Sequence, residues 1–341
     1  MEDSAVFIGF VIVLAYVFDF INGFHDAANT IATIVTTGVL TPRQAVLWAS
    51  FFNFIAFMFF SLMVAKTIGN GLIDPSMVNP ALIFSALIGA IMWNLITWFF
   101  GLPSSSSHAL IGGLAGAAVV KGGFATLKLA GFIKVGIGMC ISPILGLLAG
   151  LVLSHVLSRL FQKTPEHKKM RWFKGFQLAS SAFLSLTHGG NDAQKTMGII
   201  AVLLFSTSWL SGPFYIPFWV VISCHAVISL GTLSGGWRIV RTLGTKITPL
   251  TPLRGSAAET GAATIIFAAT DFGIPVSTTQ TVTGSIAGVG LLQGVQETNW
   301  AMLRVIGLSW LLTIPAAGCI AGGMHILSAK ASNALWLTMI Y

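Results

Sequence analysis

Residues 20–30 read Phe-Ile-Asn22-Gly-Phe-His25-Asp26-Ala-Ala-Asn29-Thr30, and residues 187–196 read Thr-His-Gly-Gly-Asn191-Asp192-Ala-Gln-Lys195-Thr196. When the two stretches are aligned, Asp26 falls on Asp192 and Asn29 falls on Lys195, an offset of 166 residues. Internal matches are examined first because a repeat determines how the whole chain is organised. This match indicates that two related halves follow one another in the chain.

A second pair of motifs recurs in the same order. Residues 101–108, Gly-Leu-Pro-Ser-Ser-Ser-Ser-His, match residues 273–280, Gly-Ile-Pro-Val-Ser-Thr-Thr-Gln, at an offset of 172 residues. Two matches in one order, separated by a single short insertion, point to duplication rather than chance. The chain is therefore predicted to contain a first transmembrane repeat over 1–160, a linker over 161–174 and a second transmembrane repeat over 175–341.

The composition is that of a membrane protein. Of the 341 residues, 55% are hydrophobic and only 8% are charged, whereas about 25% are charged in an ordinary soluble domain. The chain also contains 25 Phe, 10 Trp and 37 Gly residues, and such enrichment is typical of packed transmembrane helices with aromatic belts. We expect an all-α polytopic membrane protein.

Apolar stretches of the roughly 20 residues that a bilayer span requires occur near 4–21, 44–64, 80–100, 129–160, 213–232, 257–272 and 301–327. Shorter stretches interrupted by glycine occur at 25–37, 107–120, 175–187, 192–206 and 276–292. Together they predict about 10–12 transmembrane segments, several of them broken or re-entrant helices.

The basic residues give a formal charge of +8. They cluster in short loops between apolar runs, which is the pattern of positive-inside topology and not of nucleic-acid binding. Within 163–174 the linker has five basic residues and one acidic residue, so we place it in the cytoplasm. The second loop of the second repeat is basic and that of the first is not, so the equivalent loops are expected on opposite sides. This pattern predicts inverted-topology repeats with a site near the bilayer midplane.

The two hydroxyl-rich motifs are candidate anion sites. Proline followed by Ser and Thr begins a helix well, but a helix that begins inside an apolar region leaves about four backbone donors unpaired. An oxyanion satisfies these donors and is favoured by the helix dipole. The alternative is that the hydroxyls only strengthen helix packing. The candidate substrate-binding residues are Ser105, Ser106, Ser107, Ser277, Thr278 and Thr279.

Asp26 and Asp192 are candidate cation-binding residues, because a carboxylate inside an apolar segment usually faces a cavity, a partner or an ion path. Beside backbone broken by glycine, such a group is expected to coordinate Na⁺ or to take up a proton. The alternative is a buried helix cap or an ion pair. We add Asn22 and Asn191 to this group, and also Glu259, whose counterpart in the first repeat is Leu87. The histidines outside the hydroxyl motif show no metal-ligand spacing, so no resident metal is predicted. His25 and His188 flank the two aspartate motifs and are expected to influence the aspartates.

Lys195 marks a difference between the repeats. An ammonium at this position is expected either to take the place of a coupling cation or to pair with the anion, and the alternative is an ion pair with Asp192. Lys195 joins the candidate substrate-binding residues together with Asn29, Thr30 and Thr196.

A hydrolase built on Ser107 and His108 is disfavoured because the residue equivalent to His108 is Gln280, which cannot act as a general base. The sequence contains no Gly-x-Ser-x-Gly or His-Glu-x-x-His motif either. We therefore expect a protein that is not an enzyme.

These motifs resemble the inorganic phosphate transporter (PiT) family, bacterial type, over nearly the whole chain. The resemblance implies a multi-pass phosphate permease of the bacterial inner (plasma) membrane that works as a secondary symporter, has inverted repeats and forms a homodimer. It also implies that Asp26 and Asp192 are needed for transport. The Gln194-Lys195 pair is similar to bacterial members that couple phosphate, or metal-phosphate, to H⁺ and not to Na⁺. No cofactor is implied beyond the co-transported cation. A sulfate permease and an anion channel remain the alternatives.

Overall fold

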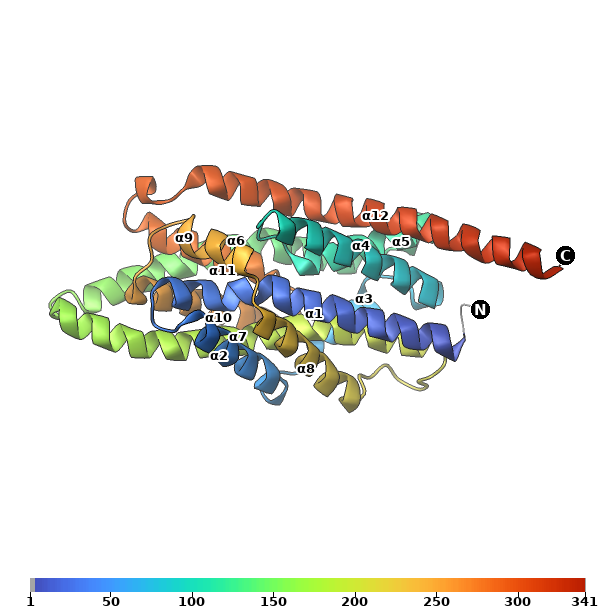
Figure 1. Ribbon diagram of the computed structural model, residues 1–341, viewed down its shortest axis with the longest axis horizontal. Coiled ribbons are helices and arrows are strands. Elements are labelled where there is room, and N and C mark those ends of the chain that lie inside the picture. Colours follow the sequence, from blue (N-terminus) through green and yellow to red (C-terminus); the bar gives the residue numbers. More distant parts are fainter. Residues whose placement is uncertain (1–3, 341) are drawn as a thin grey trace.

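The computed structural model describes residues 4–340, except for the side chains of Pro75 and residues 331–340. Within that range the chain forms helices and no strand, as predicted (Figure 1). Four single-turn 3₁₀ helices supplement the α-helices. The α-helices are α1 (Ala5–Thr36), α2 (Pro42–Ile55), α3 (Met63–Gly71), α4 (Pro80–Phe99), α5 (Ser106–Gly122), α6 (Leu129–Leu160), α7 (Glu166–Ser206), α8 (Phe218–Ser234), α9 (Trp237–Thr245), α10 (Pro252–Asp271), α11 (Thr278–Leu291) and α12 (Trp300–Ile340).

Helices α1–α6 and α7–α12 follow one order. Each set has a long helix, a sharply bent pair, a 20-residue helix, a short helix and a second long helix. The 20-residue helices α4 and α10 both begin at a proline, after an Asn79 or a Thr251 whose side chain caps the helix. Helices α1 and α7, the first of each set, run in opposite directions along the bundle (Figure 1).

Four of the helices, α1, α4, α6 and α12, are long and apolar enough to cross a membrane. The pairs α2/α3 and α8/α9 are bent by 79° and 72°, and they raise the number to six if each pair is one broken span. Helices α5 and α11 have 17 and 14 residues, or about 26 and 21 Å at 1.5 Å per residue, so they are shorter than a span. The polytopic fold with broken helices is as predicted.

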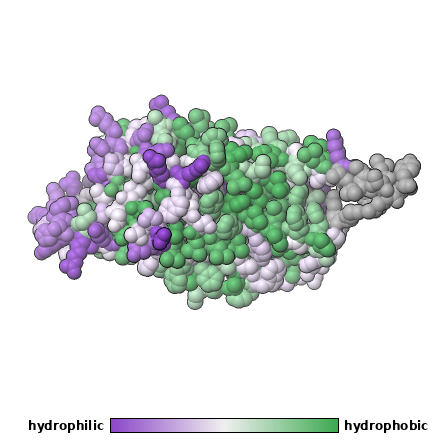
Figure 2. Space-filling model, viewed as in Figure 1, coloured by the Kyte–Doolittle hydropathy of each residue, from purple (hydrophilic) through white to green (hydrophobic). Residues whose placement is uncertain are grey.

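Hydrophobic residues form a broad band across the middle of the face shown in Figure 2. Hydrophilic residues gather at the end of the bundle where α6 joins α7 (Figures 1 and 2). Of the predicted linker over 161–174, only residues 161–165 lie outside a helix, because α7 already begins at Glu166. The basic residues of this segment therefore lie mostly on the first turns of α7.

The breaks before α5 and α11 have the same structure. Helices α4 and α10 end in Schellman motifs, in which Gly101 (φ +65°) and Gly273 (φ +62°) adopt the left-handed conformation. In the first motif the Leu102 N–H bonds to the Thr97 carbonyl, and in the second the Ile274 N–H bonds to the Ala269 carbonyl. Pro103 and Pro275 then prevent the helix from continuing. The breaks predicted within 101–108 and 273–280 are thus confirmed.

Each break is held by the 9-residue helix of the other half of the chain, α3 or α9. The Thr67 hydroxyl of α3 donates to the Gly273 carbonyl at 2.8 Å, and the Thr242 hydroxyl of α9 donates to the Gly101 carbonyl at 2.9 Å. These bonds satisfy carbonyl groups that end a helix away from water. The two halves therefore fix one another's helix breaks.

The prediction of glycine-broken backbone at the aspartate motifs is wrong. Helices α1 and α7 run without interruption through Asp26 and Asp192, joining the short segments expected at 25–37, 175–187 and 192–206 to their neighbours. The glycines serve close packing instead: a Cβ on Gly23 would lie 2.1 Å from the Ile228 carbonyl oxygen, and one on Gly189 would lie 2.6 Å from that of Asn53. Tight helix contacts thus explain glycines that the sequence alone suggests are helix breakers.

The same kind of packing holds α11 against α6. A Cβ on Gly284 would lie 2.2 Å from the Pro143 carbonyl oxygen, and one on Gly288 would lie 2.0 Å from that of Leu147. Backbone cannot yield as a flexible side chain can, so these positions admit only glycine unless the helices separate.

We predict that Gly288→Ala lowers the free energy of unfolding by about 1–3 kcal/mol, because the added methyl group forces α11 away from α6. The matched control is Gly136→Ala in α6, where a Cβ meets nothing within 4 Å. That change should be neutral or stabilising by up to about 1 kcal/mol. Reversible unfolding of the detergent-purified proteins measures both, and equal stability of the two variants would contradict the packing described here.

Candidate functional site

The polar motifs lie between two apolar clusters of the bundle. Helix α1 contributes residues from Ile8 to Phe18 to one cluster and residues from Ala27 to Ile34 to the other. Helix α7 contributes Leu184 to the second cluster and residues from Ala193 to Leu204 to the first. The polar residues of both helices fall between these stretches, so the candidate site is near the middle of the bundle.

The starts of α5 and α11 are built alike. The Ser105 hydroxyl accepts a hydrogen bond from the His108 N–H, and the Ser277 hydroxyl accepts one from the Gln280 N–H at 3.2 Å. Both residues are thus N-caps. Their hydroxyls stabilise the helix starts. Of the next two residues in each motif, Ser107, Thr278 and Thr279 hydrogen-bond to residues of the aspartate motifs.

Lys195 connects the two helix starts. Its ammonium donates to the Ser107 hydroxyl at the start of α5, and to the Val276 carbonyl, just before α11, at 3.2 Å. It also forms an ion pair with Asp192, one turn earlier in α7. Because one ammonium contacts both motifs, the two helix starts meet at a single point, next to a carboxylate.

The second oxygen of the Asp192 carboxylate accepts a hydrogen bond from the Thr278 hydroxyl at 3.1 Å. It also lies 3.2 Å from His188 Nε2. The other ring nitrogen of His188 is 3.2 Å from the Asn53 side-chain oxygen. Asp192 therefore contacts an ammonium, an imidazole and a hydroxyl, all within the bundle.

Asp26 lies at the head of a chain of hydrogen bonds. His25 Nδ1 is 2.7 Å from the Asp26 carboxylate, and His25 Nε2 is 3.1 Å from the Thr97 hydroxyl. The Ser104 hydroxyl, which precedes α5, donates to Thr97 at 2.8 Å. Ligand atoms of Asp26, His188 and Asp192 all lie within 4.8 Å of one another, so the two aspartates share one centre although they are far apart in the sequence.

Asn29 occupies the position in α1 that corresponds to Lys195 in α7. Its amide donates to the Thr279 hydroxyl at 2.9 Å and lies 3.5 Å from the Thr278 hydroxyl. The predicted contact between the aspartate motifs and the hydroxyl motifs is therefore seen from both halves.

The other predicted residues are close to the aspartates in sequence, but the hydrogen bonds of their side chains go to other groups. The Thr30 hydroxyl bonds to the Ala27 carbonyl of its own helix, Thr196 donates to Asp19, and Asn191 donates to Thr270. Asn22 is buried one turn before Asp26 and its side-chain atoms have no hydrogen-bond partner. These residues shape the surroundings of Asp26 and Asp192.

Unpaired polar atoms gather on the same motifs. Buried polar groups in proteins nearly always have hydrogen-bond partners, so unpaired ones mark places where a ligand or water binds. Several side chains of the motifs carry such atoms: Asn22, Asn29, Ser106, His108, Asn191 and Gln280. Both His108 nitrogens and the Gln280 side-chain oxygen are among them, so the two equivalent positions are unpaired in both repeats.

Glu259 does not belong to this centre. Its carboxylate accepts hydrogen bonds from Thr33, Gln177 and Ser180. Ser180 precedes Asp192 by 12 residues of one helix, or about 18 Å along its axis. Glu259 thus forms a separate buried polar cluster.

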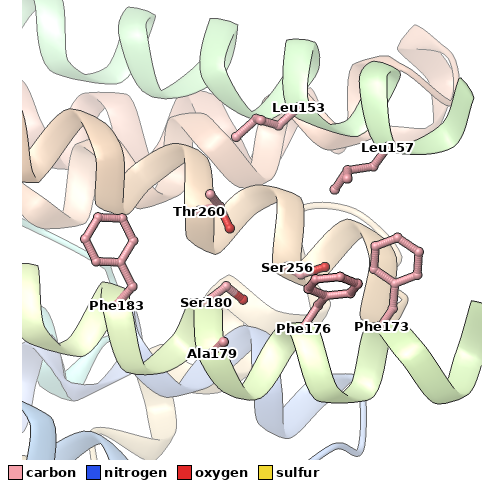
Figure 3. A pocket seen from close by; sticks show the side chains of 9 residues that line it. All are labelled: Leu153, Leu157, Phe173, Phe176, Ala179, Ser180, Phe183, Ser256 and Thr260. Carbon is pink, nitrogen blue, oxygen red and sulfur yellow. The ribbon is translucent and has the colours of Figure 1, made fainter. Parts of the chain in front are cut away.

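Ser180 also lines a cavity of about 360 Å³ between α6, α7 and α10 (Figure 3). Its walls are mainly apolar side chains, among them Leu153, Leu157, Phe173 and Phe183. This cavity lies beside the Glu259 cluster and contains none of the aspartate or hydroxyl motif residues.

The central site is closed to solvent. Asp26 is 2% exposed, Asp192 is 0% exposed and Lys195 is 1% exposed, and the hydroxyl motifs are buried as well. A polar centre that can hold ions but opens to neither surface requires the helices to move before a ligand can enter or leave. The structure therefore corresponds to an occluded conformation.

Sequence reasoning noted His188 as a residue that flanks the second aspartate motif, and the structure brings it into contact with Asp192. The Val276 carbonyl was not identified as part of this centre. Every residue has a backbone carbonyl, so a contact with one does not restrict the residue type and cannot be found from the sequence. The Thr97–Ser104 part of the chain of hydrogen bonds was likewise missed, because it depends on how α1 packs against α4.

Comparisons with known proteins agree with this geometry. Residues 22–321 match the PHO4 phosphate transporter family. A protein of Rhizobium meliloti named "probable low-affinity inorganic phosphate transporter" is 55% identical over 311 residues, which cover 91% of this chain and 93% of that protein. A Bacillus subtilis protein of the same name is 42% identical over 307 residues, covering 89% of this chain and 92% of the relative.

A solved structure titled "The sodium-dependent phosphate transporter" superposes on 95% of this chain and 99% of that chain, with a TM-score of 0.86 and 26% identity. These names support phosphate as the anion that the family transports and give no support to the sulfate alternative. The resemblance found in the motifs is confirmed, and with it a multi-pass location in the plasma membrane. From its motifs, its fold and these relatives, the chain belongs to the phosphate transporter family.

Proposed function

We propose that this protein is a secondary active symporter that carries inorganic phosphate across the plasma membrane together with a cation, H⁺ in preference to Na⁺. The observation that carries the proposal is the meeting of two helix starts and two buried carboxylates at one point in the bundle. The protein would move phosphate without altering it chemically and would need no resident cofactor.

The helix starts suit an oxyanion. Each provides backbone N–H groups, the positive end of a helix dipole and hydroxyl groups. The unpaired Ser106 hydroxyl and the paired Thr278 and Thr279 hydroxyls lie on the first turns of α5 and α11. Phosphate at neutral pH can also donate a hydrogen bond, and Asp26 and Asp192 offer acceptors beside the cradle.

Pairs of buried Asp and His side chains favour H⁺. Asp26 pairs with His25, which continues to Thr97 and Ser104 through hydrogen bonds. In the second half, Asp192 lies 3.2 Å from His188 Nε2. Chains of buried Asp and His residues carry protons in pumps and transporters, so both halves offer groups suited to carrying a proton next to the anion.

Transport as metal-phosphate is a second form of the same proposal. Asp26, His188 and Asp192 offer two carboxylates and one imidazole within 4.8 Å of one another, and this set suits a divalent metal that travels with phosphate. Uptake into proteoliposomes separates the two forms, because removal of divalent metal should stop transport only if phosphate travels with the metal.

The proposed mechanism is alternating access. The site is closed to both surfaces, and α1 and α7 run in opposite directions (Figure 1), which supports two inverted repeats that exchange roles as the site opens to either side. Assembly as a homodimer, which the family resemblance implies, is part of the proposal.

Uptake of radiolabelled phosphate into proteoliposomes tests the function. We expect saturable, uphill accumulation driven by an inward H⁺ gradient, with little change when Na⁺ replaces K⁺. An anion channel, which can use the same helix starts, would show conductance and no uphill accumulation. Uptake that neither a pH gradient nor a Na⁺ gradient accelerates would contradict symport.

We predict that Asp26→Asn and Asp192→Asn each lower the initial rate of phosphate uptake about tenfold or more, since each removes a charged hydrogen-bonding partner from the centre. Asp74→Asn is the control, because Asp74 lies in a loop and bonds to Ser76 at the surface. Retained gradient-driven uptake in both central variants would exclude the coupling role of the aspartates.

The cradle predicts different effects for two neighbouring serines. Ser105→Ala removes an N-cap and should destabilise the protein by about 1 kcal/mol. Ser106→Ala removes an unpaired hydroxyl, so we expect stability to change by less than about 0.5 kcal/mol while the KM for phosphate rises. Thermal unfolding and uptake kinetics give both values, and an unchanged KM for Ser106→Ala would remove this hydroxyl from the site.

A further inference from the structure

Lys195 is one of the largest fully buried side chains of the protein. Its ammonium contacts a carboxylate oxygen of Asp192, the Ser107 hydroxyl and the Val276 carbonyl. Carboxylate, hydroxyl and backbone carbonyl oxygens are the ligands that a small hard metal cation prefers in proteins. The ammonium therefore occupies a position with the surroundings of a cation site.

The first half contains the same frame without the ammonium. Asp26 corresponds to Asp192, Thr279 corresponds to Ser107, and Asn29 corresponds to Lys195. The contact between Asn29 and Thr279, at 2.9 Å, repeats the contact between Lys195 and Ser107. The Asn29 side-chain oxygen has no hydrogen-bond partner. One frame thus holds a tethered cation, and the other holds a neutral amide with a free acceptor.

We propose that the Lys195 ammonium is a built-in cation, which fills a site that would otherwise bind a free Na⁺ and so removes one transported ion from the cycle. The inference rests on the proposed symport of phosphate. Bringing phosphate beside Asp26 and Asp192 is costly unless positive charge is present. A tethered ammonium supplies that charge in every cycle and returns with the empty carrier, whereas a free ion crosses the membrane with the substrate.

The decisive variant is Lys195→Asn, which gives the second half the side chain found in the first. Binding of ²²Na⁺ to the purified protein should rise by one ion per chain relative to the unsubstituted protein. In proteoliposomes, phosphate uptake by the variant should require Na⁺, and the reversal potential should show one more positive charge moved per phosphate. If Lys195 were only a structural partner of Asp192, its replacement would change neither the number of bound Na⁺ ions nor the charge moved per phosphate.

Two further variants serve as controls. Lys195→Met removes the ammonium without offering an oxygen ligand, so it should bind no additional Na⁺. Lys128→Asn replaces an exposed lysine that also donates to a carbonyl, that of Asn70, at 2.8 Å. It should leave Na⁺ binding and phosphate uptake unchanged.

The variant also gives a stability readout, because the loss of the ammonium leaves Asp192 buried without its cation. The thermal midpoint of Lys195→Asn should be higher in NaCl than in choline chloride, and this difference should be larger than for the unsubstituted protein. If Lys195→Asn cannot be isolated in either salt while the double variant Asp192→Asn/Lys195→Met folds, Na⁺ cannot replace the ammonium and the proposal is wrong.

A folded Lys195→Asn that binds no additional Na⁺, or that carries phosphate as well without Na⁺ as with it, would also overturn the inference. These outcomes differ from a failure of the proposed function. If the unsubstituted protein carried no phosphate, the number of bound Na⁺ ions would still decide whether Lys195 fills a cation site.

Discussion

The structure depends on the burial of two helix N-termini in the middle of an apolar bundle. A helix that begins there leaves backbone donors without partners in a medium that offers no water. Ser105 and Ser277 satisfy one donor each, and the remaining donors and the helix dipoles favour a bound anion. In the proposed function, a bound oxyanion completes the hydrogen bonding that the protein leaves unfinished at these helix starts.

Several features of the fold keep these helix starts in place. Gly101 and Gly273 end the preceding helices, and threonines from the opposite half hold the carbonyls of both glycines. Glycines on α11 bring it against the backbone of α6. In the proposed function, phosphate adds negative charge beside Asp26 and Asp192. The Lys195 ammonium, which pairs with Asp192, offsets part of that charge.

The sequence predicted the chemistry of the site better than its backbone. Proline and hydroxyl runs identified the helix breaks because both residue types act locally, and the internal repeat brought Asp26 and Asp192 together without any knowledge of the fold. Glycines near those aspartates suggested broken helices, but they mediate helix contacts, which depend on neighbours far away in the sequence. Glu259 was grouped with the aspartates because it is an acid within an apolar stretch of sequence. Only the packing of α10 against α7 shows that it lies elsewhere.

A density map of the protein in lipid nanodiscs with phosphate bound is the most direct test of the account. In that map we expect a tetrahedral density in contact with the first turns of both α5 and α11. This density should lie within reach of the Ser106 and Thr279 hydroxyls and beside Asp26 and Asp192. Phosphate density at any other place in the bundle, with the two helix starts unoccupied at saturating phosphate, would contradict it.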